Sequence, residues 1–261
     1  MPIITLLSDF GIEDAYVAAM KGVIAGIAPE ARLVDITHLV PPQDVAFARF
    51  RLLSVAPFFP AGTVHLVVVD PGVGTARRAV AVRSRRGSCF VAPDNGVLLG
   101  ALDADPPLAA VELTDPRFWR TPTPSATFHG RDVFAPAAAH LARGVALESM
   151  GSAVAPAELV RLELSPCQMI PGGAQGAVQA VDRFGNVISN VPDALLADRG
   201  AWSVSIGGRT VAAHRTYSDV HPHEMLALVG SHGFVEVAVR RGDAQRVLRA
   251  QVGDRVEVRW A

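Results

Sequence analysis

Asp70 is the residue of this chain whose position most clearly predicts chemistry. It ends a run of β-branched residues, Val67 to Val69, and opens the glycine-rich turn Pro71-Gly72-Val73-Gly74. A buried parallel strand delivers a functional group to the edge of an open sheet in this way. Arg77 and Arg78 follow in the same short loop, so the site carries both signs of charge and either arginine can be the partner of Asp70.

Asp9 is a second carboxylate that follows a predicted strand. Strand-end carboxylates can accept hydrogen bonds from two neighbouring hydroxyls, such as those of a ribose. The alternative is that Asp9 and Asp70 only cap the turn or helix that follows them. The loop after Asp70 is too rich in glycine for simple capping, whereas the two interpretations are evenly balanced for Asp9.

His129 can complete a set with Asp70 and Arg77. An arginine stays charged at any working pH, and a histidine beside it should stay neutral and can accept or orient a proton. Together the three side chains could hold and polarise a water molecule. Taken alone, a histidine before Gly130-Arg131-Asp132 is more often structural, and a loop arginine is usually solvated.

Two other polar clusters carry weaker signals. The segment Asp182 to Asn186 places polar groups between two β runs, where an ordinary hairpin turn is the safer interpretation. The side chains that invite a metal interpretation lie in a proline-containing loop without the spacing that makes ligands converge, so no metal site is predicted. These are His214, His221, His223 and Glu224.

The first part of the chain alternates predicted strands and helices. Strands are expected at 3–7, 32–36 and 64–69, and helical spacing is expected from Tyr16 to Pro29 and after Asp44, a plausible N-cap. Further short strands are expected at 79–82, 89–91 and 109–113, followed by an alanine-rich helix from Phe128 to about Arg143. This alternation is typical of parallel βαβ units.

After about Met150 the pattern changes to short alternating runs with glycine-bearing turns. We expect an α/β fold in residues 1–165, with a mostly parallel sheet flanked by helices. Residues 172–261 are expected to form a smaller antiparallel, β-barrel-like domain.

Composition excludes several classes of protein. The 261 residues are half hydrophobic with a net charge of −1, which argues for real cores and against a nucleic-acid surface. Cys89 and Cys167 match no redox or ligand spacing, so we expect two ordinary thiols. No signal peptide and no membrane-spanning run is evident, so a soluble cytoplasmic protein is expected.

Six motifs in order along the chain resemble one family, the S-adenosylmethionine (SAM) hydroxide adenosyltransferases, which are relatives of the fluorinases and chlorinases. Nearly the whole chain is covered by the resemblance. The motifs are Ser8-Asp9-Phe10-Gly11 with Asp14, Val34-Asp35-Ile36-Thr37-His38, Val69 to Thr75, Pro93-Asp94-Asn95-Gly96, Thr127 to Asp132, and Phe184-Gly185-Asn186.

The resemblance implies that water or hydroxide attacks C5′ of the SAM ribose and releases adenosine and L-methionine. It places the water-binding triad on Asp70, Arg77 and His129, and gives the ribose hydroxyls to Asp9. Because Asp70, His129 and Gly130 differ from the halogenating relatives, water rather than halide is the implied nucleophile. Asp14 and Asp182 match positions near the methionine end, and the matches to adenosine contacts in the β domain are Asn186, Ser231, Glu236 and, more weakly, the backbone near Ala244.

The resemblance also implies a homotrimer with its sites at subunit interfaces, so that Ser231 and Glu236 would serve a neighbour's active site. No cofactor is implied. The main alternative is a SAM- or adenosine-binding sensor with negligible turnover. A methyltransferase is disfavoured because the usual glycine-rich SAM loop does not follow the first strand.

Overall fold

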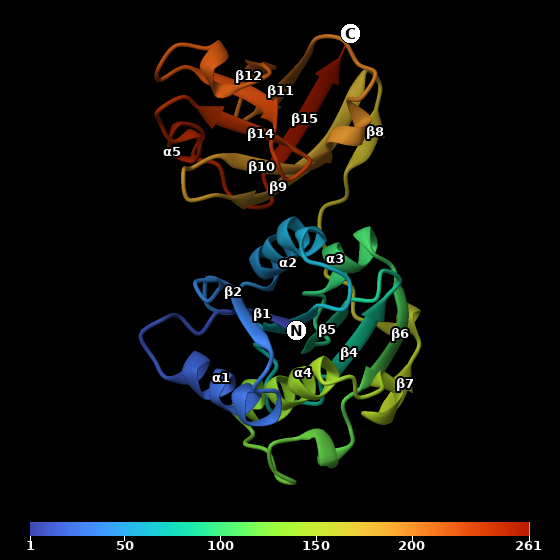
Figure 1. Cartoon of the computed structure of the whole chain (residues 1–261). Helices are drawn as coiled ribbons and strands as arrows, with labels where there is room; N and C mark the ends of the chain where they lie inside the picture. The colour runs from blue at the N-terminus through green and yellow to red at the C-terminus, as the bar shows by residue number, and fades with distance from the viewer. Residues whose placement is uncertain (261) are drawn as a thin grey trace. The chain divides into compact units, whose positions relative to one another are not determined.

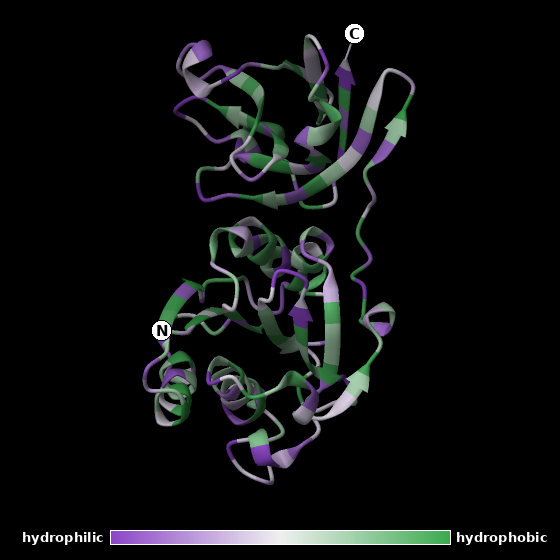
Figure 2. Ribbon diagram, turned by 45° about the vertical axis from the view of Figure 1, so that its right-hand side comes forward, coloured by the Kyte–Doolittle hydropathy of each residue, from purple (hydrophilic) through white to green (hydrophobic). Residues whose placement is uncertain are grey.

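The computed structural model describes residues 1–260, which divide into two compact units, Met1–Leu162 and the residues from Glu163 onward. Each unit has its own sheet (Figure 1). The expected combination of an α/β fold with a second antiparallel β part is confirmed. In both units hydrophobic residues recur along the strands, between hydrophilic ones (Figure 2).

The first unit is built on a seven-stranded sheet in the order β2-β1-β3-β5-β4-β6-β7. Pairing is parallel from β2 to β5 and antiparallel from β5 to β7. Its strands are β1 (Ile3–Ser8), β2 (Arg32–Thr37), β3 (Val64–Val68), β4 (Ala79–Ser84), β5 (Cys89–Pro93), β6 (Pro107–Glu112) and β7 (Ser152–Val154). The strand β3 is buried on both faces, which explains why its residues other than His65 are all apolar and mostly β-branched.

Helices cover both faces of this sheet (Figure 1). The helices α1 (Tyr16–Ile27) and α4 (Ala135–Ala142) pack on one face, and α2 (Val45–Val55) and α3 (Leu99–Ala104) on the other. Asp44 accepts a hydrogen bond from the Phe47 backbone N–H at 2.8 Å, so the expected N-cap of α2 is confirmed. The helix expected from Phe128 instead begins with a π-helical turn, Gly130–Phe134, before α4.

The second unit forms a largely antiparallel sheet. Its strands are β8 (Gln168–Ile170), β9 (Gly173–Val181), β10 (Val187–Pro192), β11 (Trp202–Ile206), β12 (Arg209–Ala212), β13 (Met225–Val229), β14 (Phe234–Val239) and β15 (Arg255–Trp260), with one short helix, α5 (Ala244–Leu248). The strand order is β12-β11-β15-β9-β10-β14-β13, and β8 pairs with β9. An isolated bridge between Ala213 and Ala227 joins the chain beyond β12 to β13, the two ends of this order.

Three short strands, β7, β8 and β12, were not expected from the sequence. Each spans only three or four residues, too few for an alternating pattern to stand out. Each is a strand because it pairs with a longer neighbour: β7 with β6, β8 with β9 and β12 with β11. Among residues 1–260, no helix is both long and apolar enough to cross a membrane.

Candidate active site

Asp70 and Arg77 form a two-pronged ion pair at the carboxyl end of β3. Arg77 Nε donates to Asp70 Oδ1 at 2.7 Å, and Arg77 Nη2 contacts Asp70 Oδ2. The side chain of Arg77 is only 11% exposed and that of Asp70 only 7%. A guanidinium matches the two oxygens of a carboxylate, so this geometry fixes the orientation of both groups. Between the two arginines left open by the sequence, the structure selects Arg77 as the partner.

His129 joins this pair from a distant part of the chain. Arg77 Nη2 lies 3.0 Å from His129 Nδ1, and the guanidinium carbon lies 5.1 Å from the centre of the Phe134 ring. Burial lowers the pKa of His129, as does the charge of Arg77, while Asp70 and Asp132 oppose the shift. Because an arginine can only donate, Nδ1 must accept, and the proton of the neutral imidazole lies on Nε2.

Arg78 is engaged elsewhere. Its Nε donates to Asp94 Oδ2 at 2.8 Å, and its Nη2 donates to the Glu158 carbonyl oxygen. Asp94 also accepts the Val160 backbone N–H at 2.8 Å. Arg78 therefore links the segment around Glu158 to the sheet. Because its guanidinium is bound there, Arg77 is the arginine that pairs with Asp70.

The loop between Asp70 and Arg77 is held by local hydrogen bonds. The Thr75 hydroxyl donates to the Gly72 carbonyl oxygen at 2.7 Å and accepts from the Arg77 backbone N–H at 3.3 Å. Asn95, from the predicted turn after β5, donates its amide to the Val69 carbonyl oxygen at 2.9 Å. The backbone that carries Asp70 and Arg77 is thus fixed from both sides.

Gly74 is required where this loop meets the segment before His129. It has φ +78°, and a Cβ there would lie 2.7 Å from the Ala126 carbonyl oxygen. We expect Gly74→Ala to lower both the stability and the turnover of the protein, because the loop must move and take Arg77 with it. Gly62→Ala is the matched control, since Gly62 has φ +83° with nothing within 4 Å.

Gly62→Ala should lower the free energy of unfolding by only about 1–2 kcal/mol, the cost of a left-handed backbone conformation for alanine. Its turnover should be unchanged. Urea unfolding and initial-rate assays of both variants measure the difference. Equal losses in the two variants would show that the contact with Ala126 does not position the loop.

Asp132 anchors the chain around His129 although it is itself completely buried. Its carboxylate is contacted by Arg120 and accepts from Arg131 Nε at 2.7 Å and from the Ser125 backbone N–H at 2.9 Å. These hydrogen bonds hold the pKa of Asp132 far below its usual range. The sequence singled out the motif Thr127 to Asp132 but did not predict that Asp132 anchors this segment. That role depends on partners up to twelve residues away in the chain.

Asp9 and Asp14 occupy less constrained positions. Asp9 follows β1, which runs parallel to β3, so Asp9 and Asp70 leave neighbouring strands at the same sheet edge. Asp9 Oδ2 accepts the Gln43 backbone N–H at 2.8 Å, which occupies one of its two oxygens and fixes the carboxylate. Asp14 is exposed in the bend before α1, outside the hydrogen-bonded set of Asp70, Arg77 and His129.

In the second unit, Asp182 and Asn186 bind each other across the turn from β9 to β10. Asp182 Oδ1 accepts the backbone N–H groups of Phe184 and Asn186 at 2.8 and 2.9 Å, and its Oδ2 accepts the Asn186 amide at 2.9 Å. The Gln245 backbone N–H donates to the Gly185 carbonyl oxygen at 2.9 Å, which joins this turn to α5, where Ala244 is buried. A turn is present, as the local interpretation predicts.

Glu236 lies on β14 in a small polar cluster. It is 3% exposed, and it accepts from the Tyr217 hydroxyl at 2.7 Å and lies 3.2 Å from His232 Nε2. Ser231 is exposed in the turn from β13 to β14. Burial, the hydrogen bond to Glu236 and the charge of Asp182 raise the pKa of Tyr217, so Asp182 lies within electrostatic range of this cluster.

Sequence reasoning missed Tyr217 and His232, which hold Glu236. Tyr217 is one of two tyrosines in the chain, and that scarcity was the only available signal. The histidines of the loop before β13 make local contacts instead: the His223 N–H donates to the Arg240 carbonyl oxygen, and the His221 N–H to Glu224. Within residues 1–260, no group of three or more His, Cys, Asp or Glu could hold a metal ion.

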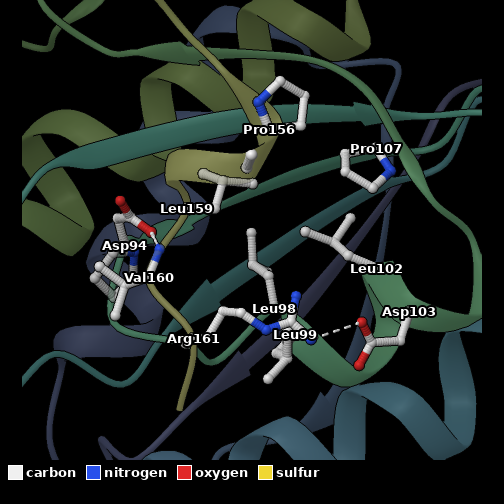
Figure 3. Close-up of a pocket in the computed structure, with 13 residues that line it drawn as sticks. Asp94, Leu98, Leu99, Leu102, Asp103, Pro107, Pro156, Leu159, Val160 and Arg161 are labelled. Atoms are coloured by element: carbon white, nitrogen blue, oxygen red, sulfur yellow. Dashed lines mark hydrogen bonds and ion pairs between the residues drawn. The ribbon is translucent and has the colours of Figure 1, made fainter.

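Two cavities lie in the first unit. One of about 280 Å³ borders Arg77 and His129 and is also lined by Trp119 and Glu112. Another, of about 70 Å³, lies between α3 and the segment Pro156–Arg161 (Figure 3). Its charged groups are committed to structure, since Arg161 pairs with Asp103 at 3.3 Å and Asp94 accepts from Val160. The cavity beside Arg77 and His129 is therefore the one that adjoins candidate catalytic residues.

Comparison with known proteins places this geometry in a family. The SAM hydroxide adenosyltransferase N-terminal domain matches residues 4–151, and the C-terminal domain of the same name matches residues 176–257. The chain belongs to the SAM hydroxide adenosyltransferase family. The expected family resemblance is thereby confirmed.

The relatives in this family include proteins named as SAM hydrolases and others named as fluorinases. An (R)-S-adenosyl-L-methionine hydrolase from Thermus thermophilus is 46% identical over 95% of both chains, and one from Salinispora arenicola is 46% identical over 98% of this chain and 97% of the relative. A fluorinase from Nocardia brasiliensis is 32% identical over 73% of this chain and 71% of its own. The crystal structure of an uncharacterized conserved protein from Thermotoga maritima is 38% identical, with a TM-score of 0.91 over 98% of this chain and 99% of that one.

Proposed function

We propose that this protein hydrolyses S-adenosyl-L-methionine to adenosine and L-methionine. The observation that carries the proposal is the joining of Asp70, Arg77 and His129 at the carboxyl end of β3, in a chain 46% identical to named SAM hydrolases. Water attacks the ribose C5′, the new C–O bond replaces the C5′–S bond, and the sulfur keeps the bonding electrons. The sulfonium loses its charge as methionine leaves, so no acid is needed for departure.

The protein's task is then to orient one water molecule and keep it in line with the C5′–S bond. Asp70 accepts a hydrogen bond from that water, because each carboxylate oxygen keeps an acceptor site beyond its contact with Arg77. His129, protonated on Nε2, donates to the water and leaves the second lone pair for attack. The proton of the attacking water passes along its hydrogen bond to the Asp70 carboxylate as the C–O bond forms, and the guanidinium of Arg77 stabilises the negative charge that develops on the water oxygen.

We assign the rest of the substrate to the residues that the resemblance named. Asp9, held by the Gln43 N–H, would bind the ribose hydroxyls, and Asp14 and Asp182 would face the methionine end. Adenosine contacts would come from Asn186, Ser231, Glu236 and the backbone near Ala244 in the β unit. Tyr217 and His232 support this set because they fix the Glu236 carboxylate.

The deciding experiment is SAM turnover in oxygen-18 water. Label in the 5′-hydroxyl of adenosine, with equal amounts of adenosine and methionine, is the expected result. Release of S-adenosylhomocysteine would instead indicate methyl transfer. Tight SAM binding without products would indicate a sensor, and either outcome would overturn the proposal.

We further propose that the protein is a cytoplasmic homotrimer whose β units complete neighbouring sites. Light scattering of the purified protein measures its mass directly, with three times the 27.5 kDa chain as the expected value. A monomer that turns over SAM at full rate would contradict this assembly.

The pH profile of turnover should report His129. Its pKa is lowered from the ordinary value of 6.5, so the imidazole is neutral at pH 7 and activity should hold there. As the pH falls through the lowered pKa, Nδ1 takes a proton, can no longer accept from Arg77, and repels the guanidinium. We expect kcat/KM to fall on the acid side with an inflection below 6.5.

His140→Gln is the control for this profile. His140 lies in α4 with its pKa lowered by burial and Arg143, and it makes none of the triad contacts. Its replacement should leave the inflection in place. An acid-side inflection at or above pH 6.5, or one that persists unchanged in His129→Ala, would contradict a role for neutral His129.

A further inference from the structure

A buried pair of a serine and a histidine lies beside Asp9, at the carboxyl ends of β1 and β2. Ser8 is 0% exposed and His38 is 5% exposed. The Ser8 hydroxyl is hydrogen-bonded to His38 Nδ1 at 2.7 Å. The motifs Ser8-Asp9-Phe10-Gly11 and Val34 to His38 contain both residues, but neither was given a role. The pair is therefore a buried polar group that the proposed hydrolysis does not yet use.

An irregularity in the sheet places His38 opposite Ser8. The pairing of β1 with β2 skips one residue of β2, Ile36, so that Leu7 pairs with Thr37. A skipped residue of this kind is a β-bulge, which re-aims the side chains that follow it. By continuation, the next residues along the two strands are Ser8 and His38. The contact between them thus depends on the bulge.

The direction of the hydrogen bonds follows from Asp35, whose Oδ1 lies 3.2 Å from His38 Nε2. Burial opposes ionisation of Asp35, but its hydrogen bond with Lys21 and its contact with His38 lower its pKa, so the carboxylate is charged at neutral pH. Because a carboxylate can only accept, Nε2 carries the proton of the neutral ring and Nδ1 accepts from the Ser8 hydroxyl. The Ser8 oxygen in turn accepts the Phe10 N–H at 3.4 Å.

These contacts hold the chain on both sides of Asp9. Ser8 precedes Asp9 and is bound by the His38 side chain, while the Gly11 N–H donates to the His38 carbonyl oxygen at 2.8 Å. The Asp9 carboxylate accepts the N–H of Gln43, which has φ +66°. A left-handed conformation is uncommon outside glycine and tends to occur at functional sites. The loop after β2 therefore fixes both the backbone and the carboxylate of Asp9.

The orientation of Asp9 matters because a ribose offers two neighbouring hydroxyls. A carboxylate accepts from both at once only in a narrow range of orientations, since hydrogen bonds weaken steeply as they bend. Ser8 has no exposed surface, so it cannot react with a substrate itself. The pair can act on a ligand only through the loop that carries Asp9.

We propose that His38 is a positioning residue for ribose binding. Through Ser8 and the Gly11 N–H it fixes the chain around Asp9, and so orients the Asp9 carboxylate toward the two ribose hydroxyls. This inference rests on the proposed hydrolysis of SAM, in which Asp9 binds the ribose.

The test compares adenosine with 2′,3′-dideoxyadenosine, which lacks both ribose hydroxyls. In calorimetry of the purified wild-type protein, adenosine should bind roughly 10- to 100-fold more tightly, the effect of a hydrogen bond to a charged group. Ser8→Ala removes the hydroxyl that links His38 to the loop. We expect the preference to fall to about threefold or less in this variant, because adenosine binds more weakly and the dideoxy compound binds as before.

Two variants of His38 test the same link from its other side. His38→Leu should lose the preference for adenosine as Ser8→Ala does. His38→Asn should keep much of it, since the amide oxygen can replace Nδ1 as the acceptor for the Ser8 hydroxyl. If His38→Leu does not fold, Ser8→Ala decides.

Thr5→Val is the matched control. Thr5 and His65 form a second buried hydroxyl–histidine pair that includes β1, with 2.8 Å between Thr5 Oγ1 and His65 Nδ1. This variant should lose stability in urea unfolding but keep the full preference for adenosine. An unchanged preference in folded Ser8→Ala would overturn the role of His38 and show that its pair with Ser8 only stabilises the fold.

Turnover in oxygen-18 water separates this inference from the proposed function. If the wild type forms labelled adenosine while Ser8→Ala keeps the full preference, hydrolysis stands and the role of His38 is refuted. A wild-type protein that forms no labelled adenosine and does not distinguish the two nucleosides would overturn both.

Discussion

Arg77→Ala should reduce SAM turnover by a factor of about 10²–10³ or more, the usual effect of removing a group that stabilises developing charge. Arg77 is the only side chain that contacts both Asp70 and His129 through described hydrogen bonds. Without it the orientation of the triad is lost, whereas the contacts to SAM that we propose for Asp9 and the β unit are left in place. Turnover should therefore fall while SAM binding, measured by calorimetry, persists.

Stability should fall in the same variant. The Asp70 side chain is 7% exposed, and removing its partner leaves a buried carboxylate without a counter-charge, which costs about 3–5 kcal/mol. Arg77→Lys separates the two effects, because it keeps the charge but cannot bridge Asp70 and His129 with a planar fork. We expect Arg77→Lys to recover much of the stability and little of the turnover.

Arg78→Ala is the matched control for loss of an arginine from this loop. Arg78 pairs with Asp94 at 2.6 Å and has no contact with the triad, so its removal should destabilise the segment near Glu158 more than it slows hydrolysis. An Arg77→Ala protein that is folded and hydrolyses SAM within a few-fold of wild type would refute the triad assignment.

Asp132→Asn should lower the free energy of unfolding by about 3–5 kcal/mol at pH 7. The substitution keeps the shape but removes the charge from a fully buried group contacted by Arg120 and Arg131. Urea unfolding measures the loss. Asp103→Asn is the control, because Asp103 is 54% exposed in its pair with Arg161 and such surface pairs contribute about 0–1 kcal/mol.

The effect of Asp132 should depend on pH in a defined direction. Its pKa is depressed in the folded state, so its stabilisation is fully present above the unfolded value near 3.9 and is lost as the pH falls through the folded value. The difference between wild type and Asp132→Asn should therefore be constant from pH 7 to about 5 and shrink only at strongly acid pH. A gap that closes already between pH 7 and 5 would assign the stabilisation to another group.

Asp132 should also act on turnover through the position of His129. Its carboxylate and carbonyl oxygen hold Ser125 and Arg120, and the same segment brings the Ala126 carbonyl oxygen against Gly74. We expect kcat to fall in Asp132→Asn with KM for SAM little changed, because the substrate contacts that we propose involve other residues.

The sequence by itself determined the elements and the residue types of the site. The run Leu66 to Val69 is apolar on both faces, which is typical of a buried parallel strand, and the abrupt change to Asp70 and glycine marks its end. Local patterns of this kind depend on neighbours in the chain, so they predicted β3, the N-cap at Asp44 and the turn at Asp182.

Only the tertiary structure decided which side chains meet. Arg77 and Arg78 are equivalent in the sequence, and their different partners, Asp70 and Asp94, follow from the path of the loop between β3 and β4. His129 lies 52 residues beyond Arg77, and no local pattern records that its Nδ1 faces the guanidinium. The same limit hid the burial of Asp132 and the hydrogen bond between Ser8 and His38, because burial and hydrogen-bond satisfaction depend on contacts made by distant segments.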